Sequence, residues 1–366
     1  MEITAAIAHE PGGAFSIQTA QLDDPRDDEI LIRIVAVGLC HTDLSVRDQM
    51  IPVPLPIVLG HEGAGIVERV GASVSSVKPG DKVLLSFNFC GACAKCEASL
   101  PSYCEHFGEE NFGGTRRDGS PCISLDGQPI SGNFFGQSSF ASYALANERN
   151  TLKVADDADL RILAPLGCGI QTGAGTVLNV LKCEAGSAIA VFGGGAVGLS
   201  SVLASVIQGC EMIIVVEPVE ARRKLAIELG ATHSIDPRAG DTAAAIRDII
   251  AGGVNYAVDT TAVPAALEAA AAALATNGTL ALVGVPAKPD TTFALSILNT
   301  VSIGATVRGI VEGDSDPAEF IPRLLQLHAE GKFPFERLIS LYPIAEINQA
   351  VDDHHHGKCV KAVLTF

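Results

Sequence analysis

Four cysteines lie close together in the first third of the chain. Their spacing is Cys-x-x-Cys-x-x-Cys-x7-Cys, formed by Cys90, Cys93, Cys96 and Cys104. Zinc in structural sites takes four such ligands in a tetrahedron, with zinc–sulfur distances of about 2.3 Å. Since this segment offers no open position for a substrate, the spacing predicts a structural zinc site. An iron–sulfur cluster uses similar spacing, but no proline follows the last cysteine. Disulfides and free thiols also remain open for these four residues.

A glycine-rich turn offers a second kind of chemistry. The segment Gly193–Gly198 reads Gly-x-Gly-x-x-Gly, follows the apolar run Ala188–Phe192 and precedes a helix-like stretch. Such a turn lets a pyrophosphate approach the backbone at a helix N-terminus. We therefore predict dinucleotide binding by Gly193, Gly195, Ala196, Val197 and Gly198. The alternative is a cluster of glycines that serves only the turn and its packing.

An acidic residue supports the dinucleotide interpretation. A second apolar run, Met212–Val216, ends at Glu217, which lies 24 residues after Gly193. A carboxylate at this place accepts hydrogen bonds from the adenosine ribose, and its charge repels a 2′-phosphate. Glu217 therefore favours NAD over NADP. Arg222 and Arg223 follow closely and weaken this preference, unless they are solvated helix residues.

A third set of reactive residues is scattered along the chain. It consists of Cys40-His41-Thr42-Asp43, His61-Glu62 and Cys168. No spacing rule joins these segments. From the residues alone, two buried apolar thiols and a core histidine remain an open alternative to a metal site.

The elements that must position these residues form two regions with different patterns of expected secondary structure. Up to about residue 150 the chain reads as short strands, such as Glu29–Val37, Gly63–Val70 and Asp81–Phe87, with Glu105–Gln137 as a long excursion. From about residue 170, strand-like runs alternate with Ala-rich helical stretches such as Ala265–Ala275. These runs are Ala188–Phe192, Met212–Val216, Tyr256–Asp259, Thr279–Val283 and Val301–Thr306. The alternation predicts a parallel sheet with helices on both faces.

The last sixty residues resemble the first 150 in their pattern of expected elements more than they resemble the middle region. They contain one clear helix, about Pro317–Gly331, and a terminal strand, Val360–Phe366. We therefore expect the nucleotide-type fold to be an insertion, with both chain ends in one domain.

The amino-acid composition limits which kinds of binding partner the protein can have. The 366 residues carry 25 Lys+Arg against 42 Asp+Glu, a net charge of −17, and are 48% hydrophobic. The apolar fraction excludes general disorder, and the acidity disfavours nucleic acid and membrane surfaces. The apolar stretch Ala188–Ile207 approaches bilayer length, but its glycines favour a strand, a turn and a helix. The chain opens on no secretory signal, so we expect a cytoplasmic, reducing location for its ten cysteines.

The whole chain resembles the zinc-dependent medium-chain alcohol dehydrogenases. The matching stretches are Gly38–Asp43, Gly60–Val67, the four-cysteine segment, Phe135–Phe140, Gly167–Gly173, Gly193–Gly198 and Gly357–Phe366. Within the family it is most similar to the bacterial aryl-alcohol (benzyl alcohol) dehydrogenases. That narrower likeness rests on Arg47-Asp48-Gln49, Arg308–Gly313, Phe320–Leu324 and Gly331–Phe335.

The resemblance implies an α/β fold, in which a Rossmann doubly wound parallel sheet is inserted into a mainly β, GroES-like catalytic domain. The catalytic domain would comprise residues 1–169 and 305–366, and the NAD-binding domain residues 170–304. It further implies two zinc ions per subunit together with NAD. Cys40, His61 and Cys168 would hold the catalytic zinc, and the four-cysteine segment the structural zinc.

The resemblance also implies roles for single residues. Thr42 would take the alcohol proton, Asp43 would orient His61, and Glu62 would lie behind the metal. The implied cofactor contacts are His41 and Lys361 at the pyrophosphate, Thr172 at the nicotinamide, Glu217 and Arg222 at the adenosine ribose, and Val283 to Val285 along the nicotinamide amide. Many members carry a histidine that ends a proton relay where this sequence has Ser45, so Ser45, His41 or another route would release the proton.

The activity implied is oxidation of an aromatic primary alcohol to its aldehyde, with hydride transfer to NAD. An allylic or monoterpenyl alcohol, such as geraniol or perillyl alcohol, is the alternative substrate. A glutathione-dependent formaldehyde dehydrogenase and a non-enzymatic NADH-binding protein are further hypotheses. The family forms homodimers or homotetramers, and Val301–Thr306 is the edge expected to pair between subunits.

Overall fold

The computed structural model describes residues 1–366, and its internal contacts divide the chain into two compact units. Unit 1 comprises Met1–Cys168, Asp316–Ile321 and Ile339–Phe366, and unit 2 comprises Gly169–Ser315 and Pro322–Leu338. The units therefore assign 169, 305–315 and 322–338 differently from the expected domains, and those domain boundaries stay a prediction. Pairing of the strand Thr306–Gly309 with the parallel sheet is one reason for the difference.

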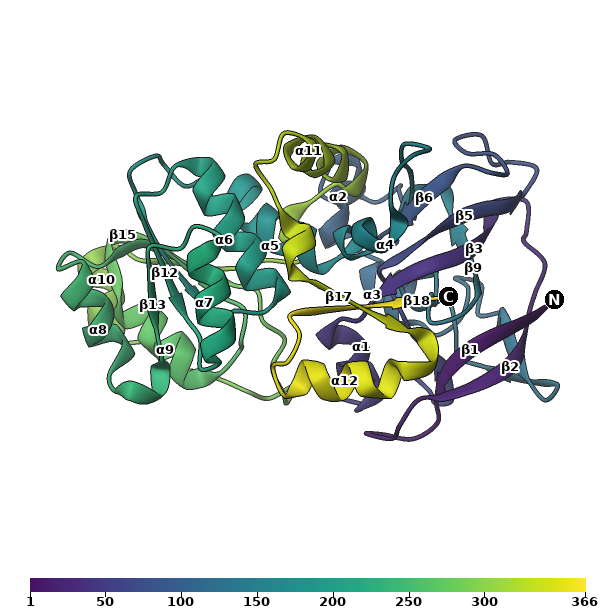
Figure 1. The fold of residues 1–366 in the computed structure, drawn as a ribbon, viewed down its shortest axis with the longest axis horizontal. Coiled ribbons are helices and arrows are strands. Elements are labelled where there is room, and N and C mark those ends of the chain that lie inside the picture. Colours follow the sequence, from purple (N-terminus) through teal and green to yellow (C-terminus); the bar gives the residue numbers. More distant parts are fainter. The chain divides into compact units, whose positions relative to one another are not determined.

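Unit 1 is built around two sheets (Figure 1). The first has the order β4-β1-β2-β7-β8, with β1 Glu2–Ala8, β2 Ser16–Leu22, β4 Ile57–Val58, β7 Ile123–Leu125 and β8 Gln128–Ile130. The second has the order β10-β6-β5-β3-β18-β17, and β9 also pairs with β3. Its strands are β3 Glu29–Gly38, β5 Gly63–Val70, β6 Lys82–Leu85, β9 Tyr143–Asn147, β10 Thr151–Lys153, β17 Ile339–Pro343 and β18 Lys361–Thr365.

Both chain ends lie in unit 1, as expected. The first strand, β1, and the last, β18, belong to its two sheets, and β18 pairs antiparallel with β3. A continuous apolar core, in which Phe87, Phe134 and Phe140 are fully buried, lies inside this unit. Its short helices are α1 His41–Arg47, α2 Ala94–Glu97, α3 Phe107–Phe112, α4 Leu160–Leu163 and α12 Ile347–His355.

The segment 105–137 is more ordered than expected. The sequence predicts a long excursion without periodicity, whereas the structure places α3, β7, β8 and a 3-10 turn, η2 Phe134–Gly136, within it. These elements are short, and two of them are three-residue strands of a hairpin. Elements this short contain too few residues to show a hydrophobic periodicity in the sequence.

Unit 2 contains a six-stranded parallel sheet in the order β13-β12-β11-β14-β15-β16. Its strands are β11 Ala188–Phe192, β12 Met212–Val216, β13 His233–Ile235, β14 Val254–Asp259, β15 Leu274–Leu282 and β16 Thr306–Gly309. The helices are α5 Gly169–Gly175, α6 Ala196–Gln208, α7 Glu220–Glu228, α8 Thr242–Ile249, α9 Pro264–Ala272 and α10 Ile297–Ile303, with a π-helical turn, η5 Thr176–Leu181. Helix α11, Pro317–Ala329, begins in the part assigned to unit 1 and ends in unit 2.

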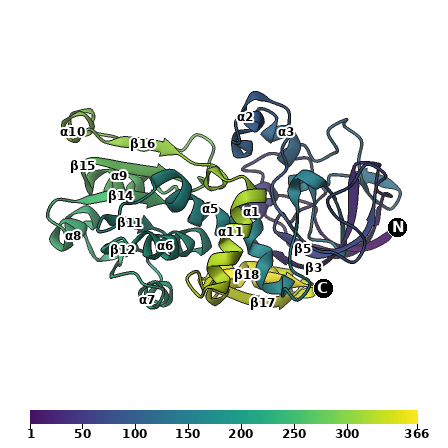
Figure 2. The same cartoon turned by 90° about the horizontal axis from the view of Figure 1, so that it is seen from above.

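The strand order makes this sheet doubly wound. From β11 the chain proceeds through α6 and α7 to β12 and β13, then returns through α8 to β14 and through α9 to β15. Right-handed crossovers therefore place α6 and α7 on one face and α8 and α9 on the other (Figure 2). The direction reverses at β11, so the carboxyl ends of β11 and β14 form the switch point where such sheets bind ligands. The predicted α/β class with a Rossmann-type sheet is confirmed.

One predicted strand is wrong. The run Val301–Thr306 begins inside α10, turns at Gly304 and only then enters β16. Ser296 caps the helix by accepting a hydrogen bond from the Asn299 backbone. The β-branched residues of this run resemble a strand in sequence, but here they lie on an exposed helix: Val301 is 74% exposed.

The apolar stretch Ala188–Ile207 consists of β11, the glycine turn and most of α6, as the sequence predicts. No helix in the structure combines the length and the apolarity needed to cross a bilayer.

Candidate active site and zinc centres

Unit 1 gathers the scattered cysteine and histidine residues into one cluster. Cys40 directly precedes α1, His61 lies two residues before β5, and Cys168 follows the 3-10 turn η4 Ala164–Gly167. The sulfur atoms of the two cysteines, one imidazole nitrogen and a carboxylate oxygen of Glu62 all lie within 4.8 Å of one another. Residues 128 positions apart in the sequence therefore form one set of metal-competent ligand atoms.

Asp43 fixes the orientation of His61. The Nδ1 atom of His61 lies 2.9 Å from Oδ1 of Asp43, which also accepts the backbone N–H of Gly60. The other oxygen, Oδ2, accepts the backbone N–H of Cys40 at 2.9 Å. Because a carboxylate only accepts hydrogen bonds, it selects the imidazole tautomer with the proton on Nδ1.

The second ring nitrogen of His61 shows whether this cluster could bind a metal ion, because a ligand nitrogen must have no other partner. Its Nε2 atom is buried and makes no hydrogen bond. A buried polar atom without a partner is costly, unless it serves as a ligand. Two thiols beside a bare imidazole nitrogen are the donors that zinc prefers, and three protein ligands are typical of catalytic zinc. The residues present therefore fit a zinc ion.

Two phenylalanine rings enclose the imidazole of His61. Phe135 stacks on His61 at a centroid distance of 4.5 Å, and Phe134 meets it edge-on at 5.4 Å. Nearby, Gln137 donates to the carbonyl groups of His61 and Ser86. The only signal in the sequence is the Phe135–Phe140 stretch, which matches the family without revealing what its side chains contact.

The electrostatics of the cluster favour the ionised form of the Cys40 thiol. A hydrogen bond from Cys168, together with the nearby charges of His61 and Lys361, holds the pKa of Cys40 well below its ordinary value despite burial. Burial lowers the pKa of His61, but the charges of Asp43 and Cys40 outweigh it and raise that pKa well above its ordinary value. Thiolates are the form in which cysteine binds a metal.

Glu62 and Lys361 form a buried ion pair beside the cluster. The ammonium of Lys361 lies 2.6 Å from Oε2 of Glu62 and donates to the Leu39 carbonyl. Burial raises the pKa of Glu62 to about 7, even though the charge of Lys361 opposes the shift. Lys361 is only 2% exposed, so its predicted contact with a pyrophosphate stays a prediction.

The proposed proton-relay residues lie on the first turns of α1. The Thr42 hydroxyl lies 3.9 Å from the Cys40 sulfur, close to the metal cluster. His41 is exposed, whereas Ser45 is buried and donates its hydroxyl to the His41 carbonyl. Ser45 is thus engaged with the backbone of its own helix, which leaves His41 as the more accessible of the two.

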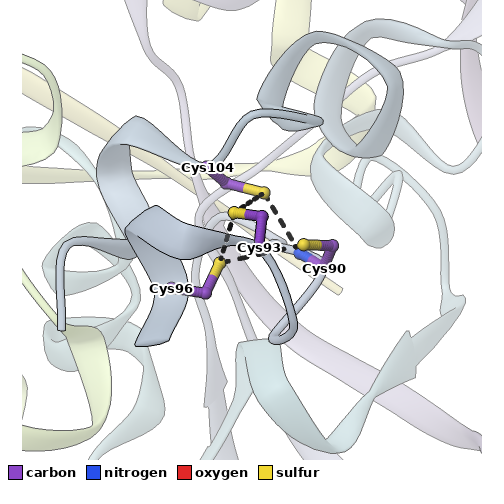
Figure 3. Close-up of side chains that lie close together, drawn as sticks. All are labelled: Cys90, Cys93, Cys96 and Cys104. Atoms are coloured by element: carbon purple, nitrogen blue, oxygen red, sulfur yellow. Dashed lines mark hydrogen bonds between the residues drawn. The ribbon is translucent and has the colours of Figure 1, made fainter. Parts of the chain in front are cut away.

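The four-cysteine segment forms a second cluster in unit 1. Its four sulfur atoms point toward one another (Figure 3) and all lie within 4.8 Å of one another. Three of the sulfur–sulfur distances are 3.9, 3.5 and 3.9 Å. A tetrahedron with zinc–sulfur bonds of about 2.3 Å has edges of about 3.8 Å. The arrangement therefore fits zinc, whereas a disulfide needs sulfurs about 2 Å apart.

Backbone groups orient these sulfurs. The backbone N–H groups of Cys90 and His106 point at the sulfur of Cys104, at 3.3 and 3.4 Å, and that of Glu105 points at Cys93. The Glu105 hydrogen bond lowers the pKa of Cys93 to about 6, while burial raises that of Cys96 to about 12. Amide dipoles aimed at sulfur stabilise the thiolate form that zinc requires.

The glycine turn of unit 2 joins β11 to α6. Gly193 adopts a φ of +100°, which side chains rarely allow, and a Cβ at Gly198 would lie 1.9 Å from the Gly193 carbonyl oxygen. Both positions therefore require glycine. Gly195 precedes the first turn of α6, which begins with Ala196 and Val197, so the free amides of a thirteen-residue helix are available for a phosphate.

Glu217 lies at the carboxyl end of β12, where the sequence predicts it. Its carboxylate accepts the backbone N–H groups of Gly194 at 2.6 Å and Val219 at 2.7 Å. A carboxylate has further lone pairs, so it can also accept a ribose hydroxyl. Arg223 is not simply solvated, because it donates to the Glu217 carbonyl and pairs with Asp236. Arg222 is half-buried beside the turn.

The other predicted cofactor residues of unit 2 lie at the same edge of the sheet. Val283 follows β15 directly and donates its backbone N–H to the Asp259 carbonyl, and Val285 lies two residues further on. Thr172, in α5, is 8% exposed and donates its hydroxyl to Glu312. Their contacts with a cofactor stay predictions.

Two family models match the chain. The alcohol dehydrogenase GroES-like domain matches residues 26–156, and the zinc-binding dehydrogenase model matches residues 196–330. Geraniol dehydrogenase of Castellaniella defragrans is 48% identical over 364 residues, which cover 99% of this chain and 97% of that protein.

Solved structures give the same result. Benzyl alcohol dehydrogenase from Acinetobacter calcoaceticus is 44% identical, with a TM-score of 0.97 over 100% of this chain and 99% of that one. An alcohol dehydrogenase zinc-binding domain protein from Burkholderia ambifaria is 50% identical, with the same TM-score and coverage.

A GroES-like β unit with two candidate zinc centres, joined in one chain to a nucleotide-binding sheet, defines a zinc-containing dehydrogenase. The chain belongs to the zinc-containing medium-chain alcohol dehydrogenases, and the predicted family is confirmed.

Proposed function

We propose that the protein oxidises primary alcohols whose carbinol carbon is attached to an unsaturated carbon, aromatic alcohols of the benzyl type foremost, with NAD as hydride acceptor. The observation that carries the dehydrogenase chemistry is the cluster of Cys40, His61 and Cys168, in which His61 Nε2 is buried without a hydrogen bond. When bound, zinc would polarise the alcohol, and NAD would accept the hydride.

The chain's own residues would perform the remaining tasks. Asp43 holds His61 in the tautomer that leaves Nε2 free for the metal. The hydroxyl of Thr42, 3.9 Å from the Cys40 sulfur, would accept the proton of the alcohol and pass it toward the exposed His41. Glu62, paired with Lys361, contributes no net charge to this site as long as both are ionised.

The substrate proposal rests on two relatives. Geraniol is an allylic alcohol and benzyl alcohol a benzylic one, and the dehydrogenases named for them are 48% and 44% identical to this chain. In both alcohols a planar unsaturated group adjoins the carbinol carbon, so the aldehyde formed is conjugated. We place the aromatic alcohol first because Arg47-Asp48-Gln49, Arg308–Gly313, Phe320–Leu324 and Gly331–Phe335 resemble the aryl-alcohol dehydrogenases. The geraniol relative makes allylic alcohols the second candidate.

The cofactor proposal rests on Glu217. Its buried carboxylate, 4% exposed, lies where the adenosine ribose is expected and would repel the 2′-phosphate of NADP. We therefore propose NAD as the preferred cofactor.

Initial rates on the zinc-loaded protein test the proposal. We expect kcat/KM to be highest for benzyl alcohol, followed by geraniol and perillyl alcohol, and at least about tenfold lower for ethanol. NAD should be preferred over NADP with each alcohol. Ethanol as the best substrate would contradict the unsaturated-alcohol proposal, and formaldehyde oxidation only with glutathione would replace it. NADH binding without any turnover would leave a non-enzymatic protein.

A further inference from the structure

A carboxylate that the proposed mechanism does not use is buried in unit 2. Glu312 opens the 3-10 turn η7 Glu312–Asp314, three residues after β16. Its side chain is 8% exposed, and its backbone adopts the left-handed region, with a φ of +50°. A non-glycine residue in this region and a buried carboxylate are both unfavourable, and they persist where surrounding contacts or a function require them.

Neutral groups of α5 face this carboxylate. The hydroxyl of Thr172 donates to Oε2 of Glu312 at 3.2 Å, and the Gln171 amide lies 3.5 Å from the same oxygen. The turn itself is fixed by Asn179, which donates to the Gly313 carbonyl at 3.2 Å. Its acidic neighbour Asp314 is paired with Arg308. The turn is therefore held by several contacts, and the Glu312 side chain is directed at α5.

The order of the strands shows which half of a dinucleotide this carboxylate would meet. In doubly wound sheets the two halves of the cofactor bind on opposite sides of the switch point. Glu217, at the end of β12, marks the adenosine side, so the nicotinamide side lies over β14, β15 and β16. Glu312 follows β16, and the backbone N–H of Ile310 donates to the Leu282 carbonyl at the end of β15. Glu312 thus belongs to the nicotinamide side.

Helix α5 ties this carboxylate to the glycine turn. The hydroxyl of Ser201, in α6, donates to the carbonyl of Gly173 in α5 at 3.0 Å. The two helices lie side by side in both views (Figures 1 and 2). Thr172 and its partner Glu312 are therefore held close to the first turn of α6, where the pyrophosphate is expected.

We propose that Glu312 is a positioning residue whose negative charge favours the oxidised cofactor over the reduced one. The nicotinamide ring carries a positive charge in NAD⁺ and none in NADH. A nearby buried anion therefore stabilises only the oxidised form, and the low local dielectric strengthens the effect. The inference rests on the proposed function, because it takes NAD as the cofactor.

The test is the variant Glu312→Gln, which keeps the shape and an oxygen that accepts from Thr172 but removes the charge. Kd values for NAD⁺ and NADH are measured on the zinc-loaded full chain by calorimetry and NADH fluorescence. We expect the Kd for NAD⁺ to rise roughly tenfold and that for NADH to change less than about twofold. Since the hydrogen bond from Thr172 is retained, Tm should stay within about 2 °C.

Two further variants separate charge from structure. Glu184→Gln removes an equal charge from an exposed side chain before β11, at the opposite edge of the sheet, and should leave both Kd values unchanged. Glu312→Asp keeps the negative charge, but its shorter side chain moves the charge away from α5. The ratio of its Kd for NAD⁺ to its Kd for NADH should therefore lie between the ratios of the wild type and Glu312→Gln. If Glu312→Gln fails to fold, the test is whether Glu312→Asp raises the Kd for NAD⁺ relative to that for NADH, compared with the wild type.

The outcomes are distinct. Equally weakened binding of NAD⁺ and NADH would assign Glu312 a merely structural role and overturn the inference. A ratio of the two Kd values that equals the wild type's in both Glu312 variants would overturn it as well. Wild-type protein that binds neither dinucleotide would instead remove the proposed cofactor, and with it the basis of the inference.

Discussion

At the scale of single residues, Asp43 determines what His61 does. One carboxylate accepts the imidazole N–H of His61 and the backbone N–H groups of Gly60 and Cys40. It therefore connects two of the three predicted zinc ligands and leaves His61 Nε2 bare. The neighbouring sequence His41-Thr42-Asp43 gives no hint that these three groups share one carboxylate.

We expect Asp43→Asn to weaken zinc binding at the catalytic centre by about 10- to 100-fold, because an amide can present an N–H to His61 and then disfavours the required tautomer. Chelator competition on purified protein measures the affinity. Asp48→Asn, an exposed carboxyl just after the same helix, is the control and should bind zinc normally. An unchanged affinity in Asp43→Asn would show that the tautomer is fixed by other means.

We expect Cys168→Ala to lose one of two zinc ions and to lower kcat by on the order of a thousandfold or more, while the protein still folds and binds NADH. The thiol belongs to the metal cluster and only its sulfur is removed. Metal analysis, initial rates and NADH fluorescence provide the three readouts. Cys122→Ala deletes the same atom from a core residue that is 4% exposed, so it should keep both zinc ions. Retained turnover in Cys168→Ala would exclude this thiol as a ligand.

At the scale of elements, the segment around α2 depends on its sulfurs. This four-residue helix buries none of its residues, and the chain around it is largely exposed. Apolar burial therefore contributes little to its position. The short helix α1 is different, because five of its seven residues are buried and packing holds it in place.

We expect Cys96→Ser to lower Tm by roughly 5 °C or more and to remove one zinc, because serine is a poor zinc ligand and structural zinc contributes folding free energy. The kcat per remaining zinc should stay close to that of the wild type. Differential scanning calorimetry with metal analysis measures both effects. Glu97→Gln, in the same helix, should change neither. A Cys96→Ser protein of normal Tm but without activity would argue for a catalytic role.

At the scale of the whole molecule, charge and cofactor binding are separate properties. The net charge of −17 disfavours anionic partners in general, yet NAD is an anion. Its binding is therefore assigned to local groups, namely the amides that begin α6 and the nearby Arg222. The metal clusters lie in unit 1 and the glycine turn in unit 2, so each unit supplies one part of the proposed reaction.

We expect added salt to stabilise the protein at pH 8, because screening reduces the self-repulsion of a chain with 42 acidic and 25 basic side chains. Tm should rise between about 20 and 500 mM NaCl, a range over which the Debye length shrinks from tens of ångströms to a few. The rise should diminish at pH 5.5, closer to the isoelectric point near 4.9, and this measurement is the control. A Tm that falls with salt at pH 8 would show that attractive ion pairs dominate.

Several features of this protein were determined by its sequence alone. The four closely spaced cysteines predict their own cluster, because a short segment brings its ligands together whatever the rest of the chain does. The runs Ala188–Phe192 and Met212–Val216, with the glycine turn between them, predict β11, β12 and the start of α6, since local periodicity and glycine geometry suffice there. The predicted strand Val301–Thr306 was wrong, because β-branched residues on an exposed helix resemble a strand in sequence.

Other features were decided only by the tertiary structure. Cys40, His61 and Cys168 meet because β3, β5 and the turn before α5 converge, and no local pattern encodes that convergence; the family resemblance alone anticipated it. Phe135 and Glu312 lie in stretches that match the family, but the sequence did not reveal that Phe135 stacks on His61 or that Glu312 is buried against Thr172. The physical reason is that contacts between distant residues depend on how sheets and helices pack, whereas metal spacing and glycine turns act within a few residues.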